Sequence, residues 1–324
     1  MGLRGAARAG PRESRRMSDR LAVTAAGLHF QNPVLLASGT AAFGREIAGA
    51  IALDELGGLV TKAVSRLPRH GAPAPRVSEF PGGMINAVGL ANPGLDEVRR
   101  TELPWLATNV KRARVLVNVV GDVVEDYAAV VAGLDDVSGV DAFELNVSCP
   151  NVKAGGMEFG ADPCSLADVV RGARAATRRP LFVKLSPTLQ DIARSAAVAV
   201  DAGADAITLV NTLPGLVVDV ERRRSALGFG TGGVSGPGLL PIGVLATWKV
   251  SRAVKAPIVG LGGVSSARDA LQYFMAGATL VGVGTAALRD PRAPERIAHG
   301  LDIWCEGEGV RSIAEIVGSL EWPA

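Results

Sequence analysis

The chain has 324 residues, a formal net charge of +2 and a hydrophobic fraction of 48%. The near-neutral charge gives no electrostatic basis for nucleic-acid binding, and no apolar run reaches the roughly 18 residues that a membrane-spanning helix needs. Three cysteines without a CxxC pair do not make a complete disulfide framework, so we expect a reducing, cytoplasmic location.

The first twenty residues are rich in arginine and contain no apolar stretch, so they do not form a secretory signal. They resemble a transit peptide in composition, but a simpler interpretation is a disordered tail over residues 1–20. A true start at Met17 would also account for them. Residues 21–324 contain no linker-like break, and we expect them to form a single domain.

Eight short apolar runs follow one another along the chain, each rich in Val, Ile or Leu and without regular polar alternation. Such runs are typical of parallel strands that are buried on both faces. Helix-like stretches separate them, for example at 123–134, 188–203 and 266–278. The apolar runs are residues 32–39, 57–64, 114–121, 141–148, 180–187, 205–212, 256–263 and 278–285.

This alternation predicts a (β/α)8 TIM barrel. A doubly wound open sheet is the alternative, but that fold usually has fewer strands and a Gly-rich loop after its first strand. Two long insertions interrupt the pattern, at residues 65–94 after the second strand and 217–238 after the sixth. Long connections in compact domains commonly carry function, so we expect inserted active-site loops there.

Polar side chains gather where the predicted strands end, and in a barrel those ends point into the active site. Burying unpaired ammonium groups is costly, so two lysines among them predict an anionic or carbonyl-rich ligand. The strand-end residues are Ser38, Lys62, Asn118, Asn146 with Cys149, Lys184, Asn211 with Thr212, Gly262 with Gly263, and Gly284 with Thr285.

The last two predicted strands end in GLGGV and GVGT. Glycines leave N–H groups free to approach a phosphate, and barrels commonly bind phosphate after strands seven and eight. We therefore expect a phosphorylated cofactor. Neither GFGTGG nor GVGTAA opens a βαβ unit, as a dinucleotide fingerprint must.

The sequence contains no HExxH, His cluster or CxxC, which argues against a metal site. Three hypotheses about the chemistry then remain open: a flavin enzyme, an aldolase and a non-catalytic phosphate-binding barrel. Amide donors with a lysine suit a flavin, whose anionic reduced form Lys184 would stabilise. An aldolase that uses Lys184 as a Schiff base and a non-catalytic phosphate-binding barrel are the alternatives.

Cys149 lies in the segment ELNVSCPNVKAGG, where the fourth predicted strand ends. A thiol in a loop that excludes water can remove a proton from carbon next to a carbonyl. Asn146 and Asn151 flank it with amides that suit a planar, amide-rich substrate. Free cysteines are often inert, and we assign that structural role to Cys164 and Cys305.

The segment NVSCPN (146–151), with the Gly-rich loop and FGADP that follow, resembles the catalytic segment of class 1 dihydroorotate dehydrogenases. Residues 61–94 are similar to subclass 1B in particular, and KLSPTLQDI, VNT, GGVSGPG, GLGGV and GVGT match in order. The resemblance covers nearly everything from about Leu21 onward. It implies an FMN-bound barrel that oxidises dihydroorotate to orotate in pyrimidine synthesis. Cys149 would take the C5 proton while hydride passes from C6 to flavin N5.

The resemblance also implies the binding residues. Substrate contacts would come from Lys62, Asn86, Ala87, Val88, Gly89, Leu90, Asn146, Asn151, Asn211 and Thr212. Flavin and ribityl contacts would come from Ser38, Lys62, Ala63, Asn118, Asn146, Lys184 and Val210, and the phosphate cradle from Gly236, Gly262, Gly263, Gly284 and Thr285.

A cysteine base points away from the membrane-associated class 2 enzymes, which use serine. Subclass 1B enzymes pass electrons to NAD+ through a second subunit that carries FAD and a 2Fe–2S cluster. This sequence has neither a cysteine cluster nor a credible NAD fingerprint, so the resemblance implies such a partner, joined to a homodimer of this chain as a heterotetramer. A fumarate-linked class 1A enzyme and a dihydropyrimidine dehydrogenase-like enzyme are the alternatives.

Overall fold

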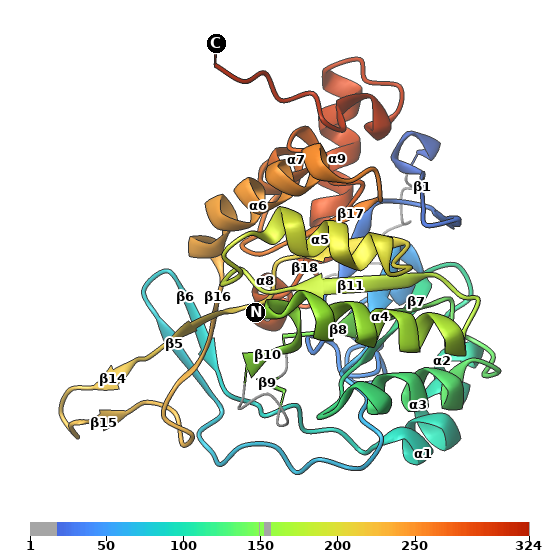
Figure 1. Ribbon diagram of the computed structural model, residues 1–324. Coiled ribbons are helices and arrows are strands. Elements are labelled where there is room, and N and C mark those ends of the chain that lie inside the picture. Colours follow the sequence, from blue (N-terminus) through green and yellow to red (C-terminus); the bar gives the residue numbers. More distant parts are fainter. Residues whose placement is uncertain (1–17, 149, 152–156, 324) are drawn as a thin grey trace, which may run out of the picture.

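A closed barrel of eight parallel strands forms the centre of the molecule (Figure 1). The computed structural model describes residues 18–148, 150–151 and 157–323. The strands follow one another around the barrel in chain order, and the last pairs with the first. The TIM-barrel prediction is confirmed, and the open-sheet alternative is wrong. The barrel strands are β3 (Val34–Leu36), β4 (Gly58–Val60), β7 (Arg114–Val119), β8 (Ala142–Asn146), β11 (Leu181–Leu185), β12 (Ala206–Leu209), β17 (Ile258–Leu261) and β18 (Leu280–Val283).

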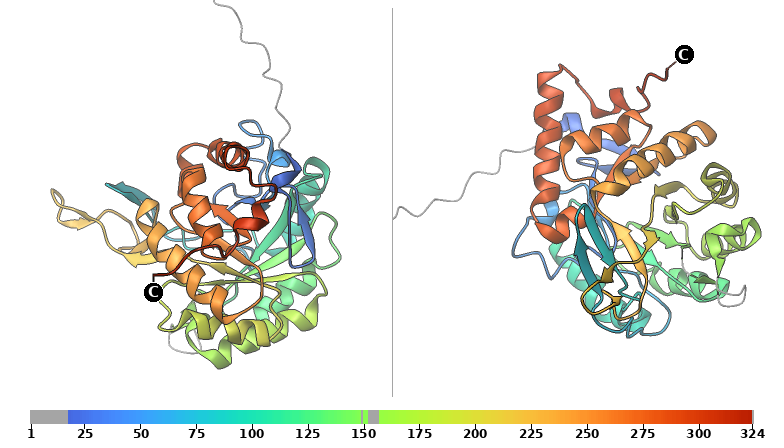
Figure 2. Two further views of the ribbon diagram at one scale, coloured as in Figure 1. Left: turned by 90° about the horizontal axis from the view of Figure 1, so that it is seen from above. Right: turned by 90° about the vertical axis from the view of Figure 1, so that its left-hand side faces the viewer.

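Helices surround the barrel and bury the outer faces of its strands (Figure 2). Every residue of β8 and β11 is buried, which explains why these strands show no polar alternation in the sequence. A π-helical turn, Val98–Glu102, joins the first two helices into one continuous segment. The helices are α1 (Leu95–Glu97), α2 (Leu103–Asn109), α3 (Val124–Leu134), α4 (Pro163–Ala176), α5 (Ile192–Asp201), α6 (Leu240–Ala253), α7 (Ala267–Met275), α8 (Thr285–Arg289) and α9 (Ala293–Gly307).

Side-chain caps determine where several helices begin. The Asp191 carboxylate accepts a hydrogen bond from Arg194 N at 3.0 Å, so α5 begins at Ile192, later than the predicted 188. Ser266 and Asp269 form a reciprocal capping box at the start of α7. All three helices expected from the sequence are present, each somewhat shorter than predicted.

The segment before the barrel contains a 3-10 turn, Asp19–Leu21, and a hairpin of β1 (Val23–Ala25) and β2 (Leu28–Phe30). The Ser18 hydroxyl donates to Asp302 on α9. Residues 1–17 lie outside the described part of the chain, so the tail over residues 1–20 and the single domain over 21–324 stay predictions.

The two insertions meet in one antiparallel sheet, in the order β13–β16–β6–β5. The first insertion supplies β5 (Val77–Phe80) and β6 (Gly83–Asn86), and the second supplies β16 (Gly232–Ser235), with β13 (Leu213–Gly215) preceding it. The pair β14 (Val218–Asp219) and β15 (Arg224–Ser225) extends away from the barrel as an arm in Figures 1 and 2. The inserted loops are therefore built as an additional sheet.

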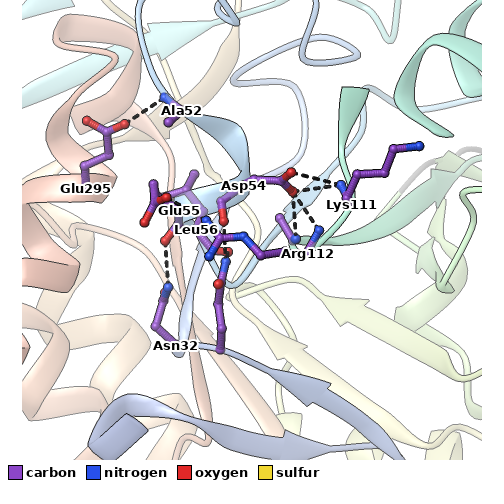
Figure 3. Close-up of polar contacts among 10 residues, drawn as sticks. Asn32, Ala52, Asp54, Glu55, Leu56, Lys111, Arg112 and Glu295 are labelled. Atoms are coloured by element: carbon purple, nitrogen blue, oxygen red, sulfur yellow. Dashed lines mark hydrogen bonds and ion pairs between the residues drawn. The ribbon is translucent and has the colours of Figure 1, made fainter. Parts of the chain in front are cut away.

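Hydrogen bonds close the opposite end of the barrel, where the strands begin (Figure 3). The Asp54 carboxylate precedes β4 and accepts from the backbone N–H groups of Lys111 at 2.8 Å, Arg112 at 2.8 Å and Ala113 at 3.1 Å, which precede β7. The Asn32 side chain, before β3, donates to Glu55 O at 2.8 Å. Side chains between the strands thus hold their starting points together.

Candidate active site

A cavity of about 650 Å³ lies at the carboxyl ends of the barrel strands, beside the inserted sheet. This volume is within the usual range of roughly 300–1,000 Å³ for small-molecule sites. Predicted site residues from all parts of the chain line this single cavity. They are Ser38, Lys62, Ala63, Asn86, Ala87, Val88, Gly89, Leu90, Asn118, Asn146, Lys184, Val210, Asn211, Thr212, Gly236, Gly262, Gly263, Gly284 and Thr285.

Two predicted residues do not enter this geometry. Cys149 lies outside the described residues, as do residues 152–156 of the loop that follows it. The backbone of Asn151 pairs with Met157 in a short antiparallel bridge, but its side chain is not described. The roles assigned to Cys149 and Asn151 therefore stay predictions.

Backbone geometry shapes the end of the cavity next to β17 and β18. Gly262 and Gly263 have φ values of +122° and +74°, which side chains rarely adopt. A Cβ on Gly263 would lie 2.6 Å from Leu240 N, at the start of α6. The Thr285 hydroxyl donates to Ser235 Oγ at 2.8 Å and links this end to the inserted sheet. The glycines thus give backbone groups close access to a ligand, as a phosphate cradle requires.

Lys184 and a pair of amides, Asn146 and Asn211, line the cavity. The Lys184 ammonium is buried and donates to Ser38 Oγ at 3.1 Å. Asn211 Nδ2 donates to Asn146 Oδ1 at 3.1 Å, while Asn211 Oδ1 accepts from Thr212 N at 2.8 Å. These contacts connect side chains at or just beyond the ends of β3, β8, β11 and β12.

Lys62 lies at the end of β4, on the side of the inserted sheet. Burial lowers the pKa of its ammonium group, and the positive charge of Arg76 lowers it further, while Glu46 partly opposes this. Burial and Arg76 thus disfavour the charged form of this half-buried group, and an anion that binds beside it would stabilise that form. Lys62 is therefore placed to attract an anionic ligand.

Two side-chain oxygens of cavity-lining residues are buried without a hydrogen-bond partner among the described residues. They are Asn118 Oδ1 and Ser148 Oγ, and both residues line the cavity. A buried polar atom without a partner costs about 1–3 kcal/mol. These atoms, the glycine backbone and the Lys184 ammonium fit a phosphorylated ligand that carries hydrogen-bonding groups along its length, such as FMN.

Comparison with known proteins decides the family. A family model for dihydroorotate dehydrogenase matches residues 20–303. The chain belongs to the dihydroorotate dehydrogenase family. The catalytic subunit of dihydroorotate dehydrogenase B (NAD(+)) from Desulforudis audaxviator is 48% identical over 303 residues, 94% of this chain and 98% of that protein. The subunit of the same name from Pelobacter propionicus is 45% identical over 305 residues, 94% of this chain and 100% of that protein. These relatives confirm the resemblance to class 1B.

Residues that were not predicted from the sequence also line the cavity of this dihydroorotate dehydrogenase family member. Ser235, Ser265 and Arg289 line it. Glu144 lies buried within the barrel, two residues before Asn146 on β8. The two-residue period of a strand puts Glu144 and Asn146 on the same face, so a charged residue inside an apolar run was an available signal.

The remaining cysteines differ from each other. Cys305 is buried, in agreement with a structural role, whereas Cys164 is exposed at the first turn of α4. The structural assignment of Cys164 was wrong, because the amphipathic pattern of α4 places that position toward solvent.

Among the described residues, no group of three or more His, Cys, Asp or Glu side chains is placed to hold a metal ion. No described helix is long and apolar enough to cross a membrane.

Proposed function

We propose that this chain is the FMN-containing catalytic subunit of a dihydroorotate dehydrogenase, which oxidises (S)-dihydroorotate to orotate in the synthesis of UMP. The observation that carries this proposal is the convergence of the predicted flavin and substrate residues on one cavity. Family membership supports it, since relatives that match nearly the full chain are named as catalytic subunits of dihydroorotate dehydrogenase B (NAD(+)).

The chain's own residues would bind the cofactor along the barrel mouth. Gly236, Gly262, Gly263, Gly284 and Thr285 would hold the phosphate, while Lys184 and Asn118 would contact the ring and ribityl groups. When bound, FMN supplies the hydride acceptor. The buried Lys184 ammonium would favour negative charge on the reduced cofactor, because Coulomb interactions are strong where water is excluded.

The substrate would lie between the cofactor and the inserted sheet. The Lys62 ammonium would attract the carboxylate, and Asn86, Asn146, Asn151 and Asn211 would hydrogen-bond the ring amides. The backbone from Ala87 to Leu90, together with Thr212, would complete the contacts. Cys149 would act as the base that removes the C5 proton.

We further propose that electrons pass to NAD+ through a partner subunit carrying FAD and a 2Fe–2S cluster, in a heterotetramer built on a homodimer of this chain. The words "NAD(+)" and "catalytic subunit" in the relatives' names support this. The same names favour it over the fumarate-linked and dihydropyrimidine dehydrogenase-like alternatives. The cytoplasmic location stays a prediction, which cell fractionation checks.

An anaerobic titration tests the proposed function. The purified chain should carry one visible flavin that bleaches on addition of dihydroorotate, and orotate should bind more tightly than uracil. Uracil binding that equals orotate binding would favour the dihydropyrimidine alternative. A colourless protein whose substrate imine is trapped by borohydride would instead establish an aldolase. Reduction of NAD+ that appears only when the partner subunit is added would support the electron route.

A further inference from the structure

A buried carboxylate spans the interior of the barrel beneath the proposed flavin site. Glu144 on β8 is 2% exposed. Its Oε1 accepts from Asn118 Nδ2 on β7 at 2.7 Å, and its Oε2 accepts from Thr208 Oγ1 on β12 at 3.0 Å. Because β11 lies between β8 and β12 in the barrel, the contact with Thr208 reaches past a neighbouring strand.

This arrangement determines which way the Asn118 amide faces. A carboxylate only accepts hydrogen bonds, so it holds the NH2 group of the amide toward itself. The oxygen must then point the other way. Asn118 Oδ1 is indeed buried and has no partner among the described residues, and Asn118 lines the cavity.

A buried carboxylate is also a costly way to stabilise a fold. Desolvation of a buried charge often exceeds what its contacts return, and apolar replacements of similar volume are often neutral or stabilising. Both donors that reach Glu144 are neutral side chains, an amide and a hydroxyl. The contacts thus serve orientation better than stability.

We propose that Glu144 is a positioning residue, which holds Asn118 Oδ1 toward the cavity as a hydrogen-bond acceptor for an N–H or O–H group of the flavin. This inference rests on the proposed FMN-dependent function. Flavin mononucleotide carries such donors on its ring N3 and its ribityl hydroxyls. An amide turned the other way would present a donor to a donor and leave the cofactor group unpaired.

The test is a double-mutant cycle read out by FMN affinity, measured as quenching of flavin fluorescence on titration with apo-protein. E144L and N118L should each weaken FMN binding by about tenfold, the worth of one hydrogen bond to a buried group. The double variant should bind no more weakly than N118L alone, because both changes remove the same contact.

Two further variants separate positioning from general stability. T208V removes the other donor but keeps the Asn118–Glu144 bond, so it should leave FMN affinity within about twofold of wild type. E144Q keeps an acceptor for Asn118, since its amino group can donate to the Thr208 hydroxyl, and it should restore most of the affinity lost in E144L. Circular dichroism melts check folding, and E144A repeats the test if E144L does not fold.

Several outcomes would overturn the inference. They are unchanged FMN affinity in E144L, losses in E144L and N118L that add in the double variant, or an E144Q variant as weak as E144L. Wild-type protein that binds no FMN would instead contradict the proposed function itself. The two failures are therefore distinguishable in the same set of titrations.

Discussion

The two ends of the barrel use polar side chains in opposite ways. Where the strands begin, Asp54 accepts three backbone N–H groups, and Asp141 and Asp205 each accept one, from Val115 and Leu181, at 2.8 Å. Where the strands end, Asn118 and Ser148 keep buried oxygens without partners among the described residues. The beginning is satisfied by the protein itself, whereas the end leaves groups for a ligand.

This difference fits a general property of barrels, in which stability resides at the amino-terminal face and chemistry at the carboxyl-terminal face. The pKa values follow the same division. Burial raises the pKa of Asp54, but the backbone N–H groups and Arg112 outweigh it and bring the pKa below its ordinary value. At the other end, burial and Arg76 disfavour the charged form of Lys62. Changes at the mouth should therefore alter binding, and changes at the base should alter stability.

The largest effect is expected from Cys149→Ala. If this thiol is the base, the variant should retain FMN and its melting temperature but lose flavin reduction by dihydroorotate by about 10²-fold or more. Stopped-flow bleaching of the flavin measures this. Cys164→Ala, which changes the exposed thiol on α4, is the matched control and should react as wild type. An unchanged reduction rate in Cys149→Ala would remove the base assignment.

Lys62→Met should weaken orotate binding by about 10- to 100-fold, because a hydrogen bond to a charged group contributes about 1.5–3 kcal/mol. Lys249→Met, on the exposed face of α6, should have no effect. In wild type, affinity should fall as the pH rises through the lowered pKa of Lys62, below the ordinary value of 10.5, because only the ammonium form attracts the carboxylate. Calorimetry across this pH range would contradict the assignment if affinity stayed constant up to 10.5.

Gly263→Ala should weaken FMN binding by about tenfold, because its φ of +74° disfavours a side chain and the backbone would relax away from the shape proposed to bind the phosphate. The added Cβ would also lie 2.6 Å from Leu240 N and displace the start of α6. Gly238→Ala is the control, since a Cβ there meets nothing within 4 Å. Equal FMN affinity in the two variants would show that the glycine backbone does not shape the phosphate site.

The smallest effect on function is expected from Asp54→Asn, which should lower the free energy of unfolding by about 1–2 kcal/mol and leave FMN and orotate binding unchanged. The lowered pKa means that the Asp54 carboxylate stabilises the fold above its ordinary pKa of 3.8, and that this contribution is lost as the pH falls through the lower folded value. Urea unfolding at pH 7 and at acid pH measures both. Asp168→Asn, which removes an exposed ion pair with Arg171, should cost less than about 1 kcal/mol. Weakened orotate binding in Asp54→Asn would contradict the assignment of stability to the end where the strands begin and of ligand binding to the end where they finish.

Much of this fold follows from local patterns in the sequence. All eight barrel strands lie within the apolar runs, because strands buried on both faces must be apolar throughout. The site residues at the strand ends follow from the same reasoning, since parallel strands bring their carboxyl ends to one edge. Helix starts were less predictable, as α5 shows, because a single cap at Asp191 decides them.

The sequence by itself determined the barrel, the strand-end residues and the family, because each depends on periodicity or on contiguous motifs. Only the tertiary structure decided that the two insertions pair, with Asn86 opposite Gly233, and that Asn86 Nδ2 donates to Gly233 O at 3.2 Å. It also decided that the Glu144 carboxylate accepts hydrogen bonds from side chains of β7 and β12. These contacts join residues distant along the chain, and no local pattern encodes them because the closed barrel alone brings their partners together.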